Sequence, residues 1–253
     1  MQDVPGSMED GRHEATPILV TPVWKDSARL AVFGAELAGE LARRDSEVCW
    51  IIADDGSGEA ERTALEKLEQ EFRKAYPRVR LHFADAHRGK GSVVREAWAL
   101  EPKAEFYAFV DADGSVTAVE MLDLIDKARE SGRSTLGIRK NTGTTKVEED
   151  PLRKLRHYGF LTACRLIVGV HSEDTQCGAK VLKGSDYRAV ADRLQEDGLA
   201  FDAELLAELS AAGFEWDEVP VNWSRKGGSR VNAWRDAGDM LAALFRIWGR
   251  LGR

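Results

Sequence analysis

The sequence predicts an α/β fold in which a mostly parallel β-sheet is flanked by helices. Short apolar runs with strand character alternate with longer segments whose apolar residues recur at helical spacing, from residue 18 to about residue 139. Strict alternation of this kind implies right-handed crossovers and parallel strands covered by helices. Two of the apolar runs also end in acidic Gly/Ser turns, at 54–57 and 111–115, and such turns meet in a crevice at the carboxyl ends of parallel strands.

The first half of the chain is expected to alternate regularly between strands and helices. Strands are predicted at 18–22, 47–52, 79–83, 106–110 and 134–138. Helices are predicted at 27–43, 59–76, 92–100 and 119–130. In the first helix, Leu30, Phe33, Leu37 and Leu41 form the apolar stripe, and Asp26 or Ser27 can cap its start.

The pattern changes after residue 139. Residues 140–150 are polar and lack periodicity, which predicts a long mobile loop of the kind that often serves as a lid. The elements expected beyond it are a partly basic helix at 151–168, a short strand at 175–181, an amphipathic helix at 201–212, a final strand at 218–223 and a loop at 224–230. The chain is thus expected to comprise a disordered arm at 1–15, one domain at 16–232 and a C-terminal amphipathic helix at 233–253.

Composition limits the class of protein and its partners. A chain of 253 residues with 43% hydrophobic residues can bury a full core, and its formal net charge of -7 argues against nucleic acid as a partner. Cys49, Cys164 and Cys177 are widely spaced, so neither a disulfide framework nor a zinc site is expected, and the predicted location is a reducing cytoplasm. No apolar stretch reaches the ~20 residues that span a bilayer, and 1–15 lacks the apolar core of a signal peptide.

The acidic pair Asp111 and Asp113 directly follows a wholly apolar run. Two carboxylates so close at the end of a buried strand repel each other, and a divalent cation relieves that repulsion. Mg²⁺ or Mn²⁺ held by this pair would bridge a diphosphate and neutralise charge on a leaving nucleoside diphosphate. A surface turn closed by side-chain hydrogen bonds is the alternative explanation.

Asp54 and Asp55 end the other acidic run. One carboxylate can accept a hydrogen bond from a nucleobase and the other can orient a ribose, whereas capping of the next helix would require no ligand. The turn 87–92, His-Arg-Gly-Lys-Gly-Ser, opens a helix and directs backbone N–H groups, Arg88 and Lys90 toward any anion there. It lacks the spacing of a P-loop, and a solvated basic turn explains it equally well.

Further candidates lie in the second half of the chain. Arg139, Arg153 and Arg156 flank the expected lid and suit phosphate binding, although a charged helix face is the alternative. Asp174 heads an expected strand and can orient or deprotonate an acceptor. Asp202 either joins that site or caps its own helix.

The run 109–115 also resembles the first motif of haloacid-dehalogenase-type phosphatases, in which the first aspartate is a nucleophile and the second a general acid. That family also needs a later acidic pair and a downstream lysine. Here Asp54 and Asp55 lie upstream, and no apolar strand after residue 138 ends in a comparable pair, which disfavours Asp111 as a nucleophile. A nucleotide-binding module without chemistry is the remaining alternative.

Taken together, these segments resemble the inverting glycosyltransferases of family 2, which have the GT-A fold. The resemblance covers residues 16–239, and its later motifs are similar to the branch of dolichyl-phosphate glucosyltransferases and dolichyl-phosphate mannose synthases. The matching segments are 22–26, 54–57, 89–91, 111–115, 174–180, 201–206 and 218–223. Trp24-Lys25-Asp26 replaces the family's Tyr-Asn-Glu, and Ala179 replaces the usual Phe.

This resemblance implies a metal-dependent enzyme that transfers a hexose from UDP-glucose or GDP-mannose to an acceptor such as a polyprenyl or dolichyl phosphate, with inversion. The implied nucleotide-sugar-binding residues are Pro22, Trp24, Asp26, Asp54, Asp55, Lys90, Asp111 and Ala112. The implied metal ligands are Asp111 and Asp113, the phosphate-binding residues Arg139, Arg153, Arg156 and Arg230, and the acceptor residues Gln176 and Asp202. The implied catalytic residues are Asp113 and Asp174, of which Asp174 would be the base for a hydroxyl acceptor, since a phosphate monoester is already ionised.

The expected C-terminal helix carries both aromatic and basic residues. They are Trp234, Phe245 and Trp248 beside Arg235, Arg246, Arg250 and Arg253. Such a helix can lie on a membrane surface and meet a lipid-linked acceptor, which would place the protein at the cytoplasmic face of a membrane. Packing on the core or on a second subunit is the alternative, so an oligomer remains open.

Overall fold

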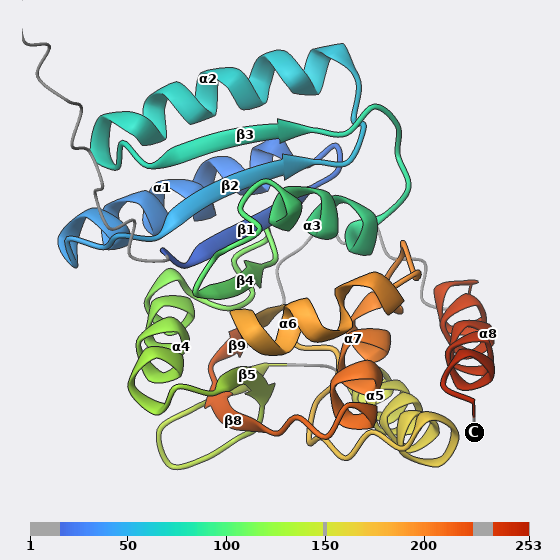
Figure 1. Cartoon of the computed structure of the whole chain (residues 1–253). Coiled ribbons are helices and arrows are strands. Elements are labelled where there is room, and N and C mark those ends of the chain that lie inside the picture. The colour runs from blue at the N-terminus through green and yellow to red at the C-terminus, as the bar shows by residue number, and fades with distance from the viewer. Residues whose placement is uncertain (1–15, 149–150, 225–234, 253) are drawn as a thin grey trace, which may run out of the picture.

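The computed structural model describes residues 16–148, 151–224 and 235–252. Its main feature is a seven-stranded sheet with helices on both faces and the strand order β3-β2-β1-β4-β7-β5-β8, which confirms the predicted α/β fold (Figure 1). The strands are β1 (Ile18–Val23), β2 (Cys49–Asp54), β3 (Val79–Phe83), β4 (Phe106–Val110), β5 (Ser134–Arg139), β7 (Ala179–Lys183) and β8 (Trp216–Val221). The helices are α1 (Ser27–Arg43), α2 (Glu59–Ala75), α3 (Lys90–Ala99), α4 (Ala118–Ser131), α5 (Pro151–Ala163), α6 (Gly184–Val190), α7 (Phe201–Ala211) and α8 (Arg235–Arg250).

The sheet divides its side chains between two apolar cores. Because successive residues of a strand point to opposite faces, Leu19 packs with α1, α2 and α4, whereas Ile18 and Val20 pack with α3, α7 and α8. Trp50 is completely buried, and its indole N–H donates to Thr21 Oγ1 over 3.0 Å. The apolar runs of the sequence are therefore strands that are covered on both faces.

The carboxyl ends of β1, β2 and β4 lie side by side, because β1 pairs in parallel with both neighbours. Val23 lies opposite Asp54 in the β1–β2 register. Trp24, Asp55 and Asp111 directly follow the three strands. The residues predicted to share a crevice are thus carried to one edge of the sheet.

β7 differs most from the sequence prediction. The strand expected at 175–181 begins at Ala179 and runs antiparallel between β4 and β5, with Ala179 opposite Val110. The reversed direction has a structural consequence, because it places the start of β7 beside the end of β4. Residues 174–178 therefore lie at the same edge of the sheet as Asp111.

Other differences are local. The helix expected at 151–168 is α-helical to Ala163 and then forms a π-helix, Cys164–Val168, before Gly169 at a φ of 72°. The sequence pattern does not predict α6, which is too short to show a clear helical period. At the end of the expected lid, β6 (Val147–Glu148) pairs with β9 (Trp223–Ser224). The expected arm at 1–15 lies outside the described residues.

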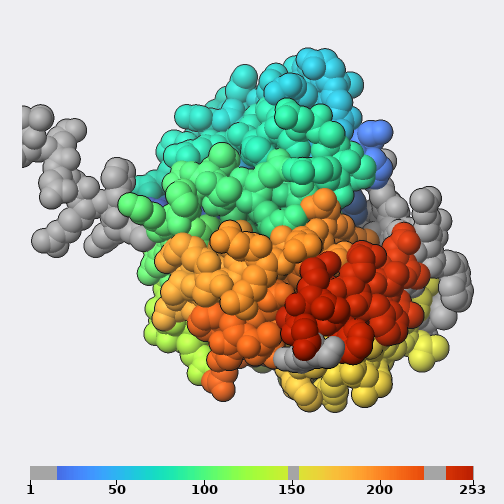
Figure 2. All heavy atoms as spheres, turned by 45° about the vertical axis from the view of Figure 1, so that its right-hand side comes forward, coloured from blue at the N-terminus to red at the C-terminus, as the bar shows by residue number. Residues whose placement is uncertain are grey.

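α8 packs on the domain with one face and exposes another. Leu244 and Ile247 are completely buried, and Arg250 forms ion pairs with Glu196 and Glu204. The exposed apolar side chains of the outer face are Leu241, Phe245 and Trp248. Figure 2 shows α8 in red at the surface of the molecule. Within the described ranges, no helix combines the length and the apolar character needed to cross a bilayer.

Replacing Leu244 by Ala is expected to lower the free energy of unfolding by about 3 kcal/mol, because it opens a cavity beneath α8. Leu241→Ala on the same helix is the matched control, since Leu241 is 43% exposed and its loss should change stability by less than about 0.5 kcal/mol. Urea unfolding of both variants measures the difference. Equal losses would show that α8 does not pack on the domain as described.

Candidate active site

Asp54 is the last residue of β2, and one of its carboxylate oxygens is buried without a hydrogen-bond partner among the described residues. Its Oδ2 accepts a hydrogen bond from the backbone N–H of Ser57 over 3.0 Å. Its Oδ1 is buried and has no hydrogen-bond partner within the described ranges. An unpartnered buried acceptor is costly, so this oxygen points to a ligand that donates an N–H or O–H. Capping does not explain Asp54, because α2 begins after Gly58 with no side-chain cap.

Asp55 belongs to an aromatic arrangement at the same edge. Its carboxylate binds His87 Nδ1 at 2.7 Å and accepts the backbone N–H of Arg88 at 2.9 Å. The His87 ring stacks on Trp24 with centroids 4.1 Å apart and an interplanar angle of 12°. Gly56 permits this close approach, since a Cβ at residue 56 would lie 2.4 Å from the backbone nitrogen of His87. Trp24, which replaces the family's Tyr, therefore presents a ring held from behind by His87.

A row of alternating charges leads to Asp111. Lys90 Nζ lies 2.9 Å from Asp111 Oδ1 and 3.2 Å from Asp202 Oδ2. Lys180, whose side chain is completely buried, donates to Asp202 Oδ1 and to the Cys177 carbonyl, both at 2.6 Å. Burial alone would lower the pKa of Lys90, but the carboxylates of Asp111 and Asp202 raise it, so Lys90 stays charged. Asp202 is thus engaged by two lysines and does not cap α7.

Asp113 occupies a turn beside another cation. Its Oδ1 accepts the backbone N–H of Ser115 at 2.9 Å, so the hydrogen-bonded turn considered for this sequence does form. Its Oδ2 lies 3.4 Å from the guanidinium of Arg29. Arg29 also binds Asp26 with two nitrogens, and this hydrogen bonding raises the pKa of Arg29. Arg29 was not singled out in the sequence, where it is one arginine on the first turn of an amphipathic helix.

Gly178 gives the Asp111 carboxylate its space. A Cβ at this position would lie 1.9 Å from Asp111 Oδ2, while the Asp111 backbone N–H donates to the Gly178 carbonyl over 2.9 Å. The side chain of Asp111 is 44% exposed, so a ligand can reach it. Over the described residues no group of three or more His, Cys, Asp or Glu side chains could hold a metal. Asp111 and Asp113 by themselves provide too few ligands for a divalent cation, so a bound molecule would have to supply the other oxygens.

Asp174 is bound by a partner that the sequence analysis had assigned to phosphate. Arg139 donates to Asp174 through Nε at 2.7 Å and Nη2 at 2.9 Å, and its backbone N–H donates at 3.0 Å. His157 Nδ1 lies 3.0 Å from the same guanidinium. Burial would raise the pKa of Asp174, but hydrogen bonds and charge from Arg139 hold it well below its ordinary value. This arrangement corrects the expectation that Asp174 acts as the catalytic base, because a carboxylate with so low a pKa accepts a proton poorly.

The remaining predicted residues are distributed around this edge. Pro22 lies on β1 opposite Ala53, and Ala112 is buried between the two acids of its turn. The amide of Gln176 donates to Met240 Sδ on α8 over 3.8 Å. Arg156 lies half-buried on α5. The side chain of Arg153, the whole of Arg230 and Trp234 lie outside the described residues.

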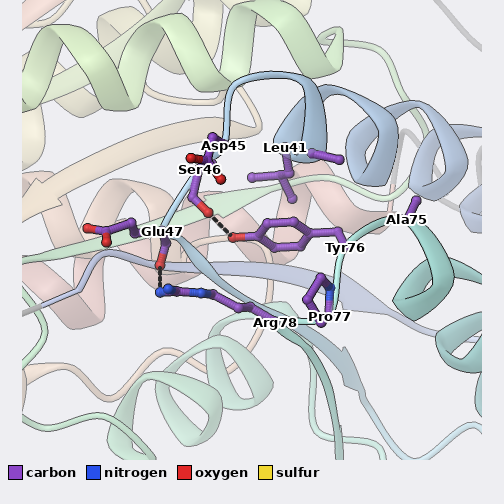
Figure 3. Close-up of a pocket in the computed structure, with 9 residues that line it drawn as sticks. Leu41, Asp45, Ser46, Glu47, Ala75, Tyr76, Pro77 and Arg78 are labelled. Carbon is purple, nitrogen blue, oxygen red and sulfur yellow. Dashed lines mark hydrogen bonds between the residues drawn. The ribbon is translucent and has the colours of Figure 1, made fainter.

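A hollow of about 480 Å³ lies elsewhere, at the amino ends of β2 and β3 (Figure 3). Its polar groups bind the protein itself. Tyr76 donates to the Ser46 carbonyl over 2.9 Å, and Arg78 donates to the Glu47 carbonyl over 3.0 Å. Burial raises the pKa of Tyr76 to about 12, so its hydroxyl stays protonated. The hollow contains none of the predicted site residues and takes no part in the site.

Comparisons with known proteins agree with this picture. No family model matches the sequence. The dolichyl-phosphate β-glucosyltransferase ALG5C of Trichomonas vaginalis is 30% identical over 228 residues, which cover 86% of this chain and 66% of that protein. The dolichyl-phosphate β-glucosyltransferase of Saccharomyces cerevisiae is 27% identical over 245 residues, which cover 90% of this chain and 73% of that protein.

One solved structure extends the comparison to the fold. Glucosyl-3-phosphoglycerate synthase from Mycobacterium tuberculosis, in complex with Mn²⁺, UDP and glucosyl-3-phosphoglycerate, matches with a TM-score of 0.65 and 14% identity. The match covers 100% of this chain and 87% of that one. At this identity the likeness concerns the architecture.

Replacing Asp174 by Asn is expected to lower the free energy of unfolding by about 3 kcal/mol at neutral pH, because Arg139 would remain buried without its carboxylate. The loss should shrink in acid. A lowered folded-state pKa contributes stability above the ordinary Asp pKa of about 4, and this contribution disappears as the pH falls through the folded-state value.

Urea unfolding at neutral pH and near pH 3 measures both effects. Glu173→Gln is the neighbouring control, because Glu173 binds Lys140 at the surface, where the side chains are 54% and 49% exposed. A loss that did not change with pH would contradict the buried ion pair.

Proposed function

Because the chain belongs to the family 2 glycosyltransferases, in the branch of the dolichyl-phosphate glucosyltransferases, we propose that it transfers glucose from UDP-glucose to a polyprenyl or dolichyl phosphate. The observation that carries this proposal is the set of carboxylates at the ends of β2 and β4, the two strands that flank β1, namely Asp54, Asp111 and Asp113. The relatives named above are dolichyl-phosphate β-glucosyltransferases, and this chain spans 66% and 73% of their lengths. Membership of this family also argues against the alternative function, a phosphatase with Asp111 as its nucleophile.

The free oxygen of Asp54 supports a uracil nucleotide. Uracil presents a single N–H between two carbonyls, which suits one unpartnered acceptor such as Asp54 Oδ1. Guanine presents an N–H and an NH₂ on the same edge, and both would need acceptors. The Trp24 ring, which follows the strand that pairs with β2 and stacks on His87, is the proposed aromatic partner of the base. GDP-mannose is therefore the second candidate donor.

The diphosphate would be held between Asp111, Asp113 and Lys90. Mg²⁺ or Mn²⁺ on the two aspartates would supply charge neutralisation for the departing UDP. The acceptor phosphate oxygen attacks the anomeric carbon in line, the bond from this carbon to the UDP oxygen breaks, and the electron pair leaves with UDP. No proton needs to be removed, since the second pKa of a phosphate monoester is about 6. This agrees with the engagement of Asp174 by Arg139.

The acceptor phosphate needs cations, and the proposed set is Arg139, Arg153, Arg156 and Arg230. Within it, Asp174 and His157 fix the orientation of Arg139. Gln176 and Asp202 lie on the acceptor side, where Asp202 acts through the two lysines that it binds. In this proposal Asp174 is a positioning residue and Asp113 a metal ligand.

Release of UDP from UDP-glucose is expected to require both a polyprenyl phosphate and Mg²⁺ or Mn²⁺. Asp113→Asn should lower kcat/KM by about 100-fold or more, since it removes charge that binds the metal. Asp123→Asn on α4, whose side chain is 61% exposed, should leave the rate unchanged. Turnover of GDP-mannose alone would favour the second donor, and binding of UDP without any turnover would favour a non-catalytic module.

We also propose peripheral membrane contact through 233–253 together with α5. Residues 151–172 contain four arginines or lysines and no acid, and 235–253 carry a net charge of +2. Since the whole chain carries -7, the remainder carries -13, so these two segments are basic while the rest of the chain, taken together, is acidic. Anionic headgroups attract such a segment.

Exposed apolar side chains accompany this charge. On α5 and the π-helix, Leu155, Tyr158 and Leu166 are 69%, 54% and 79% exposed. On the adjoining α8, Phe245 and Trp248 are 55% and 44% exposed. Arg246 and Arg250 bind Glu196 and Glu204, so the apolar side chains of α8, and not these arginines, would enter the lipid interface.

The double variant Phe245→Ser/Trp248→Ser is expected to reduce cosedimentation with vesicles of anionic phospholipid by about tenfold, because two apolar side chains no longer enter the interface. Val32→Ser on α1 is the control for an exposed apolar residue outside these segments, since Val32 is 67% exposed. Equal binding of the double variant and the wild type would contradict contact through α8.

A further inference from the structure

We propose that Lys90 is an internal counter-ion that forms an ion pair with Asp111 until a nucleotide diphosphate binds. Asp202 and Lys180 determine the strength of this ion pair. The divalent cation and the diphosphate then bind together, and the cation alone binds weakly. This inference rests on the proposed function, because it concerns the metal site assigned there.

The first observation is that both proposed metal ligands already have a cation of the protein beside them. Lys90 Nζ lies 2.9 Å from Asp111, and the Arg29 guanidinium lies 3.4 Å from Asp113. A divalent cation between these carboxylates would be close to two positive side chains. Like charges about 4 Å apart in a partly buried site repel each other strongly. A bare cation therefore meets strong repulsion.

The second observation is that the donor set is incomplete. Asp111 and Asp113 have no third acidic, histidine or cysteine neighbour, among the residues described, with which to form a metal cluster. Mg²⁺ and Mn²⁺ prefer six oxygen ligands and commonly take several from phosphates. A diphosphate supplies such oxygens, and its negative charge also offers Lys90 a new partner. A bound diphosphate would therefore supply the missing oxygen ligands and also reduce the repulsion from Lys90.

The third observation is the way in which Lys90 is held. Its ammonium is shared between Asp111 and Asp202 at 2.9 and 3.2 Å, and Asp202 is shared in turn with Lys180 at 2.6 Å. Lys180 is completely buried and has no route to solvent, so its bond to Asp202 is a fixed part of the domain. Both ammonium groups also lie near the ring of Phe109, at 4.4 and 5.3 Å from its centroid. Because Lys180 shares the Asp202 carboxylate, it weakens the ion pair between Asp202 and Lys90. Lys90 can therefore pair with Asp111.

This arrangement predicts opposite effects for two neighbours of Lys90. Lys180→Met makes Asp202 available to Lys90 alone and draws Lys90 from Asp111, so bare Mn²⁺ should bind about threefold more tightly. Asp202→Asn leaves Asp111 as the only carboxylate for Lys90, so bare Mn²⁺ should bind about threefold more weakly. Lys90→Met should strengthen the binding of bare Mn²⁺ by about tenfold and reduce the gain in affinity that UDP provides.

The electron paramagnetic resonance signal of free Mn²⁺ measures these affinities with and without UDP. For the wild type we expect weak binding of Mn²⁺ alone and binding at least tenfold tighter with UDP. Lys90→Arg keeps the charge and should behave as the wild type. Lys67→Met, on an exposed position of α2, is the control for loss of a lysine charge elsewhere.

A double-mutant cycle distinguishes an effect of Asp202 that passes through Lys90 from a direct electrostatic effect of Asp202 on the bound cation. In the Lys90→Met background, Asp202→Asn should have little further effect on bare Mn²⁺, because its action passes through Lys90. An equal effect in both backgrounds would overturn the role of Asp202. Thermal unfolding identifies variants that fail to fold, and Lys90→Met, whose side chain is 13% exposed, decides the proposal without disturbing the buried Lys180.

The outcomes distinguish this inference from the function on which it rests. If the wild type binds Mn²⁺ with UDP but Lys90→Met gains no affinity for Mn²⁺ alone, the counter-ion is refuted and the metal site stands. If the wild type binds no Mn²⁺ even with UDP, the metal assignment fails and the inference fails with it.

Discussion

The repulsion between the Asp111 carboxylate and the neighbouring acids Asp113 and Asp202 is the constraint on which the rest of the site depends. Asp54 ends β2, and Asp111 and Asp113 follow β4 at the same edge. Ionised acids in such proximity require compensation. The fold supplies it from separate elements, with Arg29 on α1, Lys90 at the start of α3 and Lys180 on β7.

The antiparallel direction of β7 contributes to this compensation. Its register places Lys180 opposite Phe109 and Ala179 opposite Val110, so Gly178 comes directly against Asp111. A parallel strand would carry residues 174–178 to the other edge of the sheet. One reversed strand therefore brings a buried cation, a glycine that makes room for the Asp111 carboxylate, and the Arg139–Asp174 pair to the site.

The regular half of the chain was predictable because β1, β2 and β4 are buried on both faces and the helices carry apolar stripes. The acids were also predictable, since carboxylates directly after apolar strands have few structural explanations. Their partners were not. Arg29 lies 84 residues from Asp113, and Lys90 lies 112 residues from Asp202, so no local pattern marks either pair. Asp174 and Arg139, 35 residues apart, bind each other, a pairing that the sequence does not indicate.

In the proposed reaction, the engagement of the acids by cations favours one class of acceptor. Asp174 is bound by Arg139, and Asp202 is bound by two lysines. Neither carboxylate is a good proton acceptor in this state, so a hydroxyl acceptor would lack the base that its activation requires. A phosphate monoester carries its negative charge into the reaction and requires cations instead. The basic segment 151–172 and the exposed apolar side chains beside it provide a surface suited to a phosphate that is attached to a lipid.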